Sequence, residues 1–202
     1  MNTMTRPTTK LAILAAAWAG AALAAGSLGL LRQLPPAMVG IGIAAAVGAF
    51  SYGSLGRGWL AEAMQSLGLR GILALNIFRL EGLYFLRLGS EGRLPTIFAD
   101  RAGWGDVAAA AGAIVLLLWR GGRGFRTALW VWNVLGVLDL AVAVGTATWL
   151  NLTSPGAMAA FTVPPFCLVP FWAVPLLLCG HVYLFASGLG EARAVPPSPQ
   201  GA

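Results

Sequence analysis

The sequence predicts an all-α integral membrane protein, a bundle of about six transmembrane helices with both termini in the cytoplasm. Of its 202 residues, 58% are hydrophobic and only 10% are charged, whereas soluble domains carry about 25% charge. The hydrophobic runs are continuous and close to about 20 residues long, which is typical of membrane-spanning helices and not of barrel strands that alternate apolar and polar residues. Arginine gathers in the short segments between these runs, which is the orientation signal of membrane proteins.

The first predicted span, residues 11–31, carries no charge and follows a polar, basic tail at residues 1–10. A cleaved signal peptide is the alternative, because Arg6 and Lys10 precede the apolar run and Ala22–Leu23–Ala24 resembles a cleavage site. The uncharged run is longer than the core of a normal signal peptide, which favours a retained span. The second predicted span begins after a pair of prolines that suits a helix start, and it covers residues 37–55.

The third predicted span, residues 71–88, is the helix that the others must accommodate. Its middle third carries Asn76, Arg79 and Glu81. Each central charge costs about 2.5–3.5 kcal/mol on insertion, which nearly cancels the gain from the apolar residues of the same helix. We therefore expect this helix to lie inside the bundle. The mildly amphipathic segment before it, residues 59–70, is expected at the membrane interface or as an extension of the span.

The fourth predicted span, residues 104–119, follows the longest charged connection, residues 89–105. Within that connection, residues 94–98 are apolar but too few to cross, so we expect them at the interface. The span is only about 24 Å long against a hydrocarbon core of about 30 Å, so it must borrow flanking residues or thin the bilayer. Asp106 near its start is predicted to cap the helix or to serve as a first-turn acid.

The fifth predicted span, residues 128–150, contains Asn133 and Asp139. The sixth, residues 163–189, contains four prolines in its first half, which we expect to be kinked or unwound. The Pro-rich tail at residues 190–202 is predicted to be disordered in the cytoplasm.

Basic residues divide unequally between the two sides of this arrangement. Eight fall on the side of the termini and four on the other, which by the positive-inside rule makes the side of the termini cytoplasmic. The densest group is Arg120, Arg123 and Arg126. We expect the chain to lie in a bacterial-type cytoplasmic (inner) membrane with the lipid bilayer as its main partner. The basic excess is explained by insertion, so no nucleic-acid partner is expected.

Arg79 and Asp139 are predicted to form an ion pair, because each falls at the midpoint of its span and an unpaired central charge is costly. Glu81 lies about 200° around the helix from Arg79 and needs another partner. The alternatives are water in a cavity, a protonated and hydrogen-bonded state, Arg87, or a cationic ligand.

His181 and Asn133 are expected to meet, because both fall in the cytoplasmic halves of their spans. A hydrogen-bonded core residue is the simplest role for a single histidine. The candidate intramembrane polar cluster therefore comprises six residues: Asn76, Arg79, Glu81, Asn133, Asp139 and His181.

No cofactor and no metal ion are expected. One histidine cannot supply both axial imidazoles of a b-type haem, and neither metal-binding spacings nor the P-loop, dinucleotide and GxSxG motifs are present. Cys167 and Cys179 lie in one apolar segment, about 18 Å apart along a helix, which is too far for a disulfide.

Three functions fit this sequence. The first is a carrier or channel-like protein for a small solute or a proton, with Arg79, Glu81, Asp139 and His181 lining a polar cavity near the midplane. The second is a non-catalytic membrane subunit or assembly factor, working as a homo-oligomer or with another membrane protein. The third, an integral-membrane enzyme acting on a lipid or quinone, is disfavoured by the shortage of polar residues.

Overall fold

The structure, a computed structural model, describes residues 7–188. Its helices are α1 (Pro7–Ser27), α2 (Pro36–Leu55), α3 (Trp59–Asn76), α4 (Gly82–Ser90), α5 (Thr96–Leu118), α6 (Phe125–Thr153) and α7 (Val174–Ala186). Short 3₁₀ or π-helical segments lie between them: η1 (Leu30–Gln33), η2 (Ile77–Glu81), η3 (Ala159–Thr162) and η4 (Val169–Ala173).

Five helices of the described range are long and apolar enough to cross a membrane: α1, α2, α5, α6 and the continuous stretch Val169–Ala186. The predicted all-α membrane class is confirmed to this extent. The second and fifth predicted spans agree closely with α2 and α6, whereas α1 begins at Pro7 and ends at Ser27, earlier than predicted at both ends. The predicted tail at 190–202 and the start of the tail at 1–10 lie outside the described residues.

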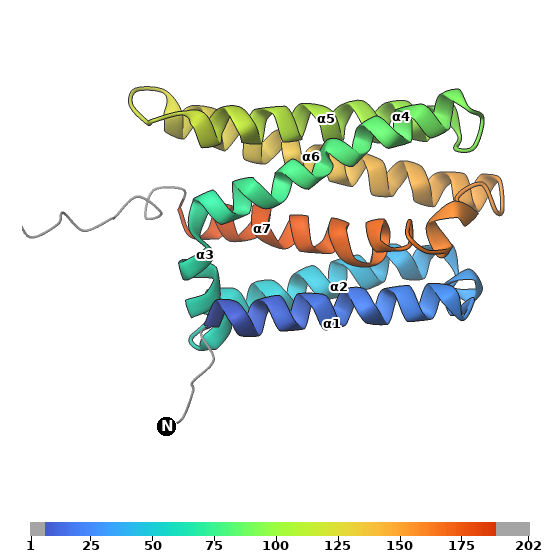
Figure 1. Cartoon of the computed structure of the whole chain (residues 1–202), viewed down its shortest axis with the longest axis horizontal. Coiled ribbons are helices and arrows are strands. Elements are labelled where there is room, and N and C mark those ends of the chain that lie inside the picture. Colours follow the sequence, from blue (N-terminus) through green and yellow to red (C-terminus); the bar gives the residue numbers. More distant parts are fainter. Residues whose placement is uncertain (1–6, 189–202) are drawn as a thin grey trace, which may run out of the picture.

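Apart from the first part of α3, the helices run along the long axis of the bundle and form two groups with α7 between them (Figure 1). On one side of α7 lie α1 and α2, of which α2 contacts α7 directly, and on the other side α5 packs against both α4 and α6. In the membrane-length stretches of α1 and of α2, only 11% of the residues are buried. In the stretch Val169–Ala186, which contains α7, 44% are buried. The outer surfaces of α1 and α2 therefore face the surroundings of the bundle, and α7 lies at its centre.

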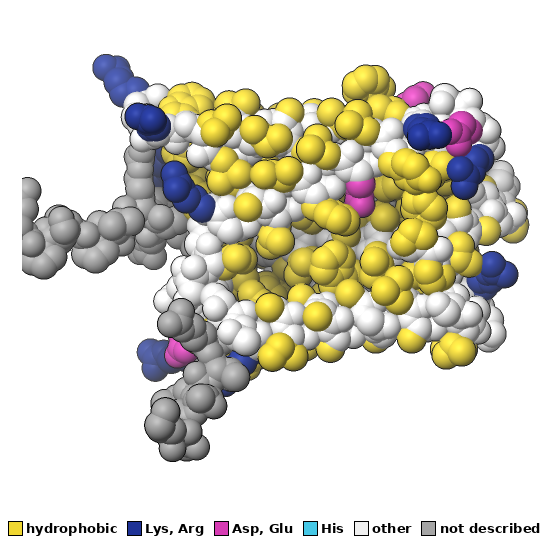
Figure 2. Space-filling view, in the orientation of Figure 1, with side chains coloured by type: hydrophobic (Ala, Val, Ile, Leu, Met, Phe, Trp, Pro, Cys, Tyr) yellow, Lys and Arg dark blue, Asp and Glu magenta, His cyan; other side chains and the backbone are white. Residues whose placement is uncertain are grey.

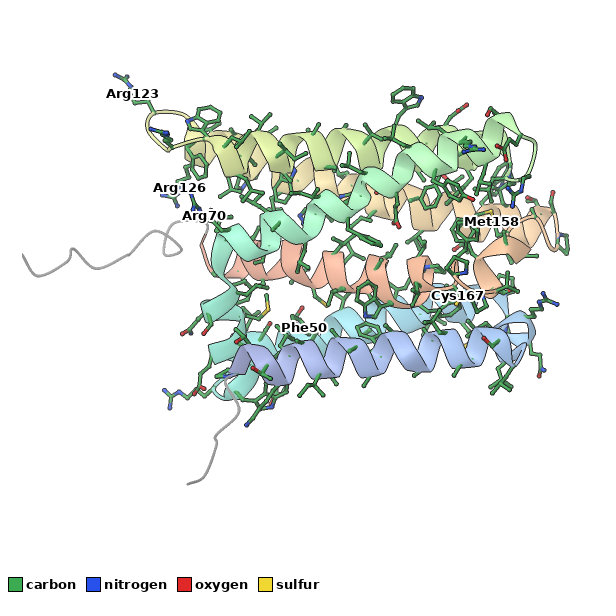
Figure 3. All side chains as sticks on the ribbon, viewed as in Figure 1. Phe50, Arg70, Arg123, Arg126, Met158 and Cys167 are labelled. Atoms are coloured by element: carbon green, nitrogen blue, oxygen red, sulfur yellow. The ribbon has the colours of Figure 1, made fainter. Side chains whose placement is uncertain are left out.

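Side-chain chemistry follows the same axis. Hydrophobic side chains cover the middle of the face shown in Figure 2, and the Lys and Arg side chains gather toward its two ends. Arg70, Arg123 and Arg126 all lie at one end, while Met158 and Cys167 lie toward the other (Figure 3). An apolar belt between two charged rims is what a lipid bilayer requires of an embedded protein, so a bilayer is a plausible surrounding for this chain.

The third predicted span is not one regular helix. α3 starts at Trp59 and changes direction at Gly68, whose φ of 60° suits glycine. Its second half then leads through the 3₁₀ segment η2 into α4, and this broken path crosses the bundle between its two ends (Figure 1). A 3₁₀ stretch inside a helical path often marks a hinge. The segment predicted for the interface, residues 59–70, forms the first part of α3 at one end of the bundle.

The fourth predicted span was placed too late. α5 begins at Thr96, directly after Pro95, and has 23 residues, about 35 Å at 1.5 Å per residue. The charged Asp100 and Arg101 are exposed on the first turns of this helix, while Phe98 is buried in the core. The expected short helix is therefore wrong, and the span takes flanking residues from the preceding connection, which was one of the two expected solutions.

The first half of the sixth predicted span is irregular, as expected from its prolines. Turns occupy the segment before η4, the π-helical segment η4 contains Pro170, and regular α-helix begins only at Val174. Proline lacks the N–H group that the helical ladder needs, which explains the interruption.

Two of the three hydrophobic clusters of the described bundle lie toward opposite ends. One contains Phe85, Phe98 and Phe161, and the other contains Ile72, Leu129 and other residues of α5, α6 and α7. Between them α4 and α5 approach closely at Gly82, where an added Cβ would lie 2.5 Å from the carbonyl oxygen of Gly103. Glycine allows this contact between backbones.

We expect Gly82→Ala to destabilise the protein by about 1–3 kcal/mol, because the new methyl group forces the two helices apart. The measurement is thermal unfolding of purified protein in detergent. Gly145→Ala is the matched control, since position 145 is exposed on α6 and nothing lies within 4 Å of its added Cβ. Equal melting temperatures for the two variants would contradict the close packing at Gly82.

Candidate functional site

Arg79 lies in η2 between the two hydrophobic clusters and is fully buried, with 0% of its surface exposed. Its Nε donates a hydrogen bond to Asp106 Oδ1 at 2.7 Å, and its Nη2 donates to Asp139 Oδ2. The predicted ion pair between Arg79 and Asp139 is confirmed. The guanidinium thus joins three elements, η2, α5 and α6, through two carboxylates.

Asp106 is the site residue that sequence reasoning missed. Because α5 begins at Thr96, Asp106 falls in the middle of that helix and does not cap its start. The sequence did offer a signal for a second acid. A guanidinium has five N–H donors, and one carboxylate accepts too few of them to satisfy a buried arginine. A second acid at the same depth was to be expected on a neighbouring helix.

Glycine makes room for this arrangement. A Cβ at position 105 would collide with the carboxylate of Asp139, and one at position 82 would lie 2.8 Å from the Cβ of Asp106. Gly105 therefore lets α6 bring its acid close to the backbone of α5. Gly82 does the same for α5 beside the start of α4.

Glu81 is partly buried two residues after Arg79. Within the described range no hydrogen bond or ion pair is recorded for its carboxyl group, although the charges of Asp106 and Arg79 act on it. Arg87 is not its partner, because the Arg87 Nε donates to Glu91 at 2.7 Å. Arg87 and Arg93 both hold Glu91 at the end of the bundle, and their hydrogen bonds lower the pKa of that carboxyl.

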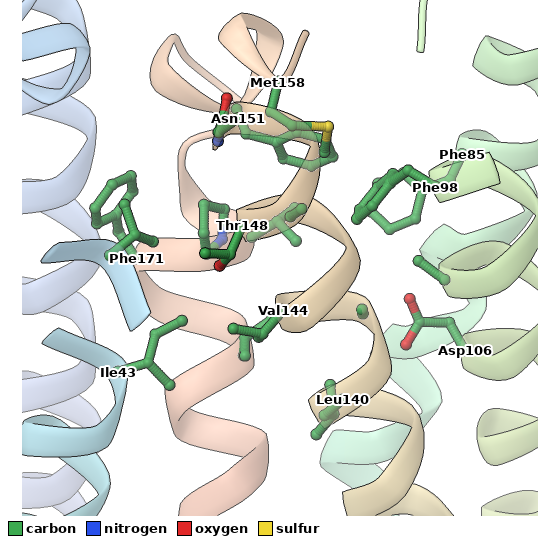
Figure 4. Close-up of a pocket in the computed structure, with 18 of the residues that line it drawn as sticks. Ile43, Phe85, Phe98, Asp106, Leu140, Val144, Thr148, Asn151, Met158 and Phe171 are labelled. Carbon is green, nitrogen blue, oxygen red and sulfur yellow. The ribbon is translucent and has the colours of Figure 1, made fainter. Parts of the chain in front are cut away.

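A cavity of about 90 Å³ lies between α2, α5, α6 and the η4–α7 segment. Its walls are mostly hydrophobic, and Asp106 points into it from α5 (Figure 4). The charged residues of its lining are both acids, Glu81 and Asp106. Toward the C-terminal end of α6 the lining turns polar, with Thr148 and Asn151.

A second hollow, a groove beside α4, adjoins this cavity. Its lining includes Phe78, Tyr84 and Phe166, and it shares Glu81, Phe85 and Val169 with the cavity. The ring of Tyr84 stacks on that of Phe166 at 5.6 Å. Glu81 therefore lines both hollows.

The other predicted residues lie outside the cavity lining. His181 is fully buried, its Nδ1 lies 2.7 Å from Asn133 Oδ1, and Asn133 Nδ2 donates to the His181 carbonyl at 3.1 Å. Their predicted meeting is confirmed. The His181 ring also packs on Trp132 at 4.9 Å and fills the space above Gly136. These contacts give it a packing role.

Asn76 is likewise held locally, since its side chain donates to the Ile72 carbonyl at 3.0 Å. Arg79, Asp139 and His181 do not line the cavity, in contrast to the polar pocket expected from the sequence. The structure instead has a largely apolar cavity with two acids in its wall. In the described range, Cys167 and Cys179 are free, and no group of three His, Cys, Asp or Glu residues is placed to hold a metal ion.

We expect Arg79→Met alone to cost about 3–5 kcal/mol, because it leaves the buried Asp106 and the partly buried Asp139 without their cation. The triple change Arg79→Met, Asp106→Leu and Asp139→Leu should recover most of the lost yield and melting temperature, since no unmatched charge of the triad remains. Arg87→Met, at an exposed ion pair, is the control and should change little. A triple variant no more stable than Arg79→Met would contradict the shared ion cluster.

The arrangement just described lies within the region in which the chain matches a protein family. The family model described as Domain of unknown function (DUF8737) matches residues 36–187, which include Arg79, Asp106, Asp139, Glu81 and the whole cavity wall. No curated protein and no solved structure matches the chain. Because the match covers most of its length, the chain belongs to the DUF8737 family.

Proposed function

We propose that this protein is a small membrane carrier whose central site exchanges a proton or a small solute through the cavity between α2, α5, α6 and α7. One observation carries the proposal: three carboxyl groups, those of Asp106, Asp139 and Glu81, lie near a single buried guanidinium, and two of them face a cavity. Packing alone would call for a balanced set of charges.

An excess of buried acids is unfavourable in a medium of low dielectric constant. The effective penalty amounts to several kcal/mol for each unmatched ion, so the site favours a bound proton or another cation that restores the balance. A cation that reaches the acids through the cavity and leaves again is the elementary step of a carrier. A neutral solute bound by Thr148 and Asn151 would use the same opening.

The broken path α3–η2–α4 is part of the proposal as a sixth membrane crossing beside the five continuous helices. It crosses the bundle between the same two ends as the other helices (Figure 1). Its 3₁₀ segment carries Arg79 and Glu81, so a change in winding at this point would move both charged groups relative to α5 and α6. Discontinuous helices at the binding site are a recurring feature of carriers. We place the protein in a bacterial-type inner membrane with both termini cytoplasmic.

The second candidate, a non-catalytic membrane subunit, is favoured by the large exposed surface of α1 and α2. The subunit and the carrier differ in whether water enters the cavity, which can be measured. A subunit whose buried charges only fix helix packing keeps its centre dry, whereas a carrier admits water to the cavity.

We expect single cysteines that replace Ala102 or Ala143, which line the cavity, to react with a membrane-impermeant thiol reagent from one side of the membrane. The background variant is Cys167→Ala with Cys179→Ala, so that the only thiol is the engineered one. Ala113→Cys is the matched control, because Ala113 is fully buried in the packed cluster of Ile72 and Leu129 and does not line the cavity. Reactivity is measured by mass shift in sealed vesicles.

Labelling at Ala102 and Ala143, with none at Ala113, supports a wet pathway and the carrier. If all three cysteines stay unlabelled while the variants fold normally, the carrier function is wrong and the subunit function takes its place.

We also expect topology reporters fused after Gly92 and after Ser154 to read external, and a reporter fused after Arg126 to read cytoplasmic. The reason is that the loops at Gly92 and Ser154 lie at the end of the bundle opposite Arg126 (Figures 1 and 3). The measurement is a pair of reporters that are active on opposite sides of the membrane. A cytoplasmic signal at Gly92 would show that the α3–η2–α4 path does not cross.

A further inference from the structure

We propose that the cavity and the adjoining groove bind an amphipathic organic cation, with its ammonium head between Glu81 and Asp106 and its apolar part in the groove. This inference rests on the proposed carrier function and names its substrate class. Three independent features of the two hollows support it: their charge, their aromatic walls and their shape.

The charge of the lining selects a cation. The cavity wall contains two carboxyl groups and no Lys, Arg or His side chain. Of these two, Asp106 is already engaged by Arg79 at 2.7 Å, whereas Glu81 is left without a recorded ion pair in the described range. A partly buried carboxylate without a cationic partner attracts a positive group and disfavours an anion.

The aromatic walls favour an ammonium group over a hydrated metal ion. Phe85, Phe98 and Phe161 form a mutual cluster with ring centroids 5.3–6.0 Å apart, and all three line the cavity. The faces of aromatic rings attract organic cations, and quaternary ammonium groups are the ligands that aromatic cages usually recognise. The same walls offer few of the oxygen ligands that a small metal ion requires.

The volumes of the two hollows suit a ligand with a small charged head and a larger apolar part. A cavity of about 150 Å³ accommodates a benzene molecule, and a trimethylammonium group is about as bulky as benzene, so the 90 Å³ found here takes only part of such a head, with the rest lying toward the groove at Glu81. The groove beside α4 is larger, about 410 Å³, and is lined by Phe78, Tyr84 and Phe166. Because Glu81 belongs to both hollows, a ligand with its head at Glu81 places its apolar part in the groove.

The test is binding of benzyltrimethylammonium to the full chain in uncharged maltoside micelles, followed by calorimetry against empty micelles. Benzylsulfonate, with the same ring and a tetrahedral anionic head, is the matched ligand control. We expect the cation to bind at least about tenfold more tightly than the anion. Glu81→Gln should weaken cation binding by about tenfold or more, because it removes the charge and keeps the size.

Two further variants separate binding from folding. Ala143→Ile fills the cavity without changing any charge and should also abolish binding, whereas Glu91→Gln, at the exposed pair with Arg87, should leave it unchanged.

A parallel titration with a single-chain choline lipid identifies the source of the ligand. Tighter binding of the lipid indicates a membrane ligand, and tighter binding of benzyltrimethylammonium indicates a soluble one.

Equal affinity for the cation and the anion, or full affinity in Glu81→Gln, would overturn the substrate class. If this happens while cysteines at Ala102 and Ala143 still react with the impermeant reagent, the carrier remains and its substrate is of another kind. Unreactive cysteines would instead remove the carrier function itself.

Discussion

The burial of one guanidinium constrains the rest of this bundle. Arg79 has no exposed surface and takes its partners from two helices that are distant in the sequence, so η2, α5 and α6 must meet at one depth. Removing the guanidinium leaves both carboxylates without their counter-charge in a medium of low dielectric constant. The glycines at 82 and 105 follow from the same requirement, because larger residues would keep these helices too far apart.

The central ion pair could be predicted from the sequence because the position of a residue along a predicted span gives its expected depth in the membrane. Arg79 and Asp139 each lie at the middle of an apolar run, and charges at the same depth in a membrane are driven to pair. Asn133 and His181 were brought together by the same reasoning. These predictions needed only the approximate positions of the spans.

Asp106 and the cavity needed more than that. Hydropathy assigned the charged residues Asp100 and Arg101 to a connection, although both lie exposed on the first turns of α5, and this shifted the start of the helix and placed Asp106 at its end. The cavity depends on side chains from several helices and from the irregular segment before η4. The residue pattern of a single segment does not predict which side chains from other segments it will contact. The three-dimensional arrangement was therefore needed to show that Glu81 and Asp106 line the same cavity.

The sequence separation of the ion cluster also has a consequence for biogenesis. Arg79 precedes Asp106 by 27 residues and Asp139 by 60, so the ribosome delivers the cation well before either anion. Until α5 and α6 arrive, the segment that carries Arg79 has no counter-charge and gains little by moving into lipid. In the proposed sixth crossing, stable partitioning of this segment therefore waits for the later helices, which carry its counter-charges. In that proposed arrangement, η2 is the last part of the central bundle to settle, even though it is made before α5 and α6.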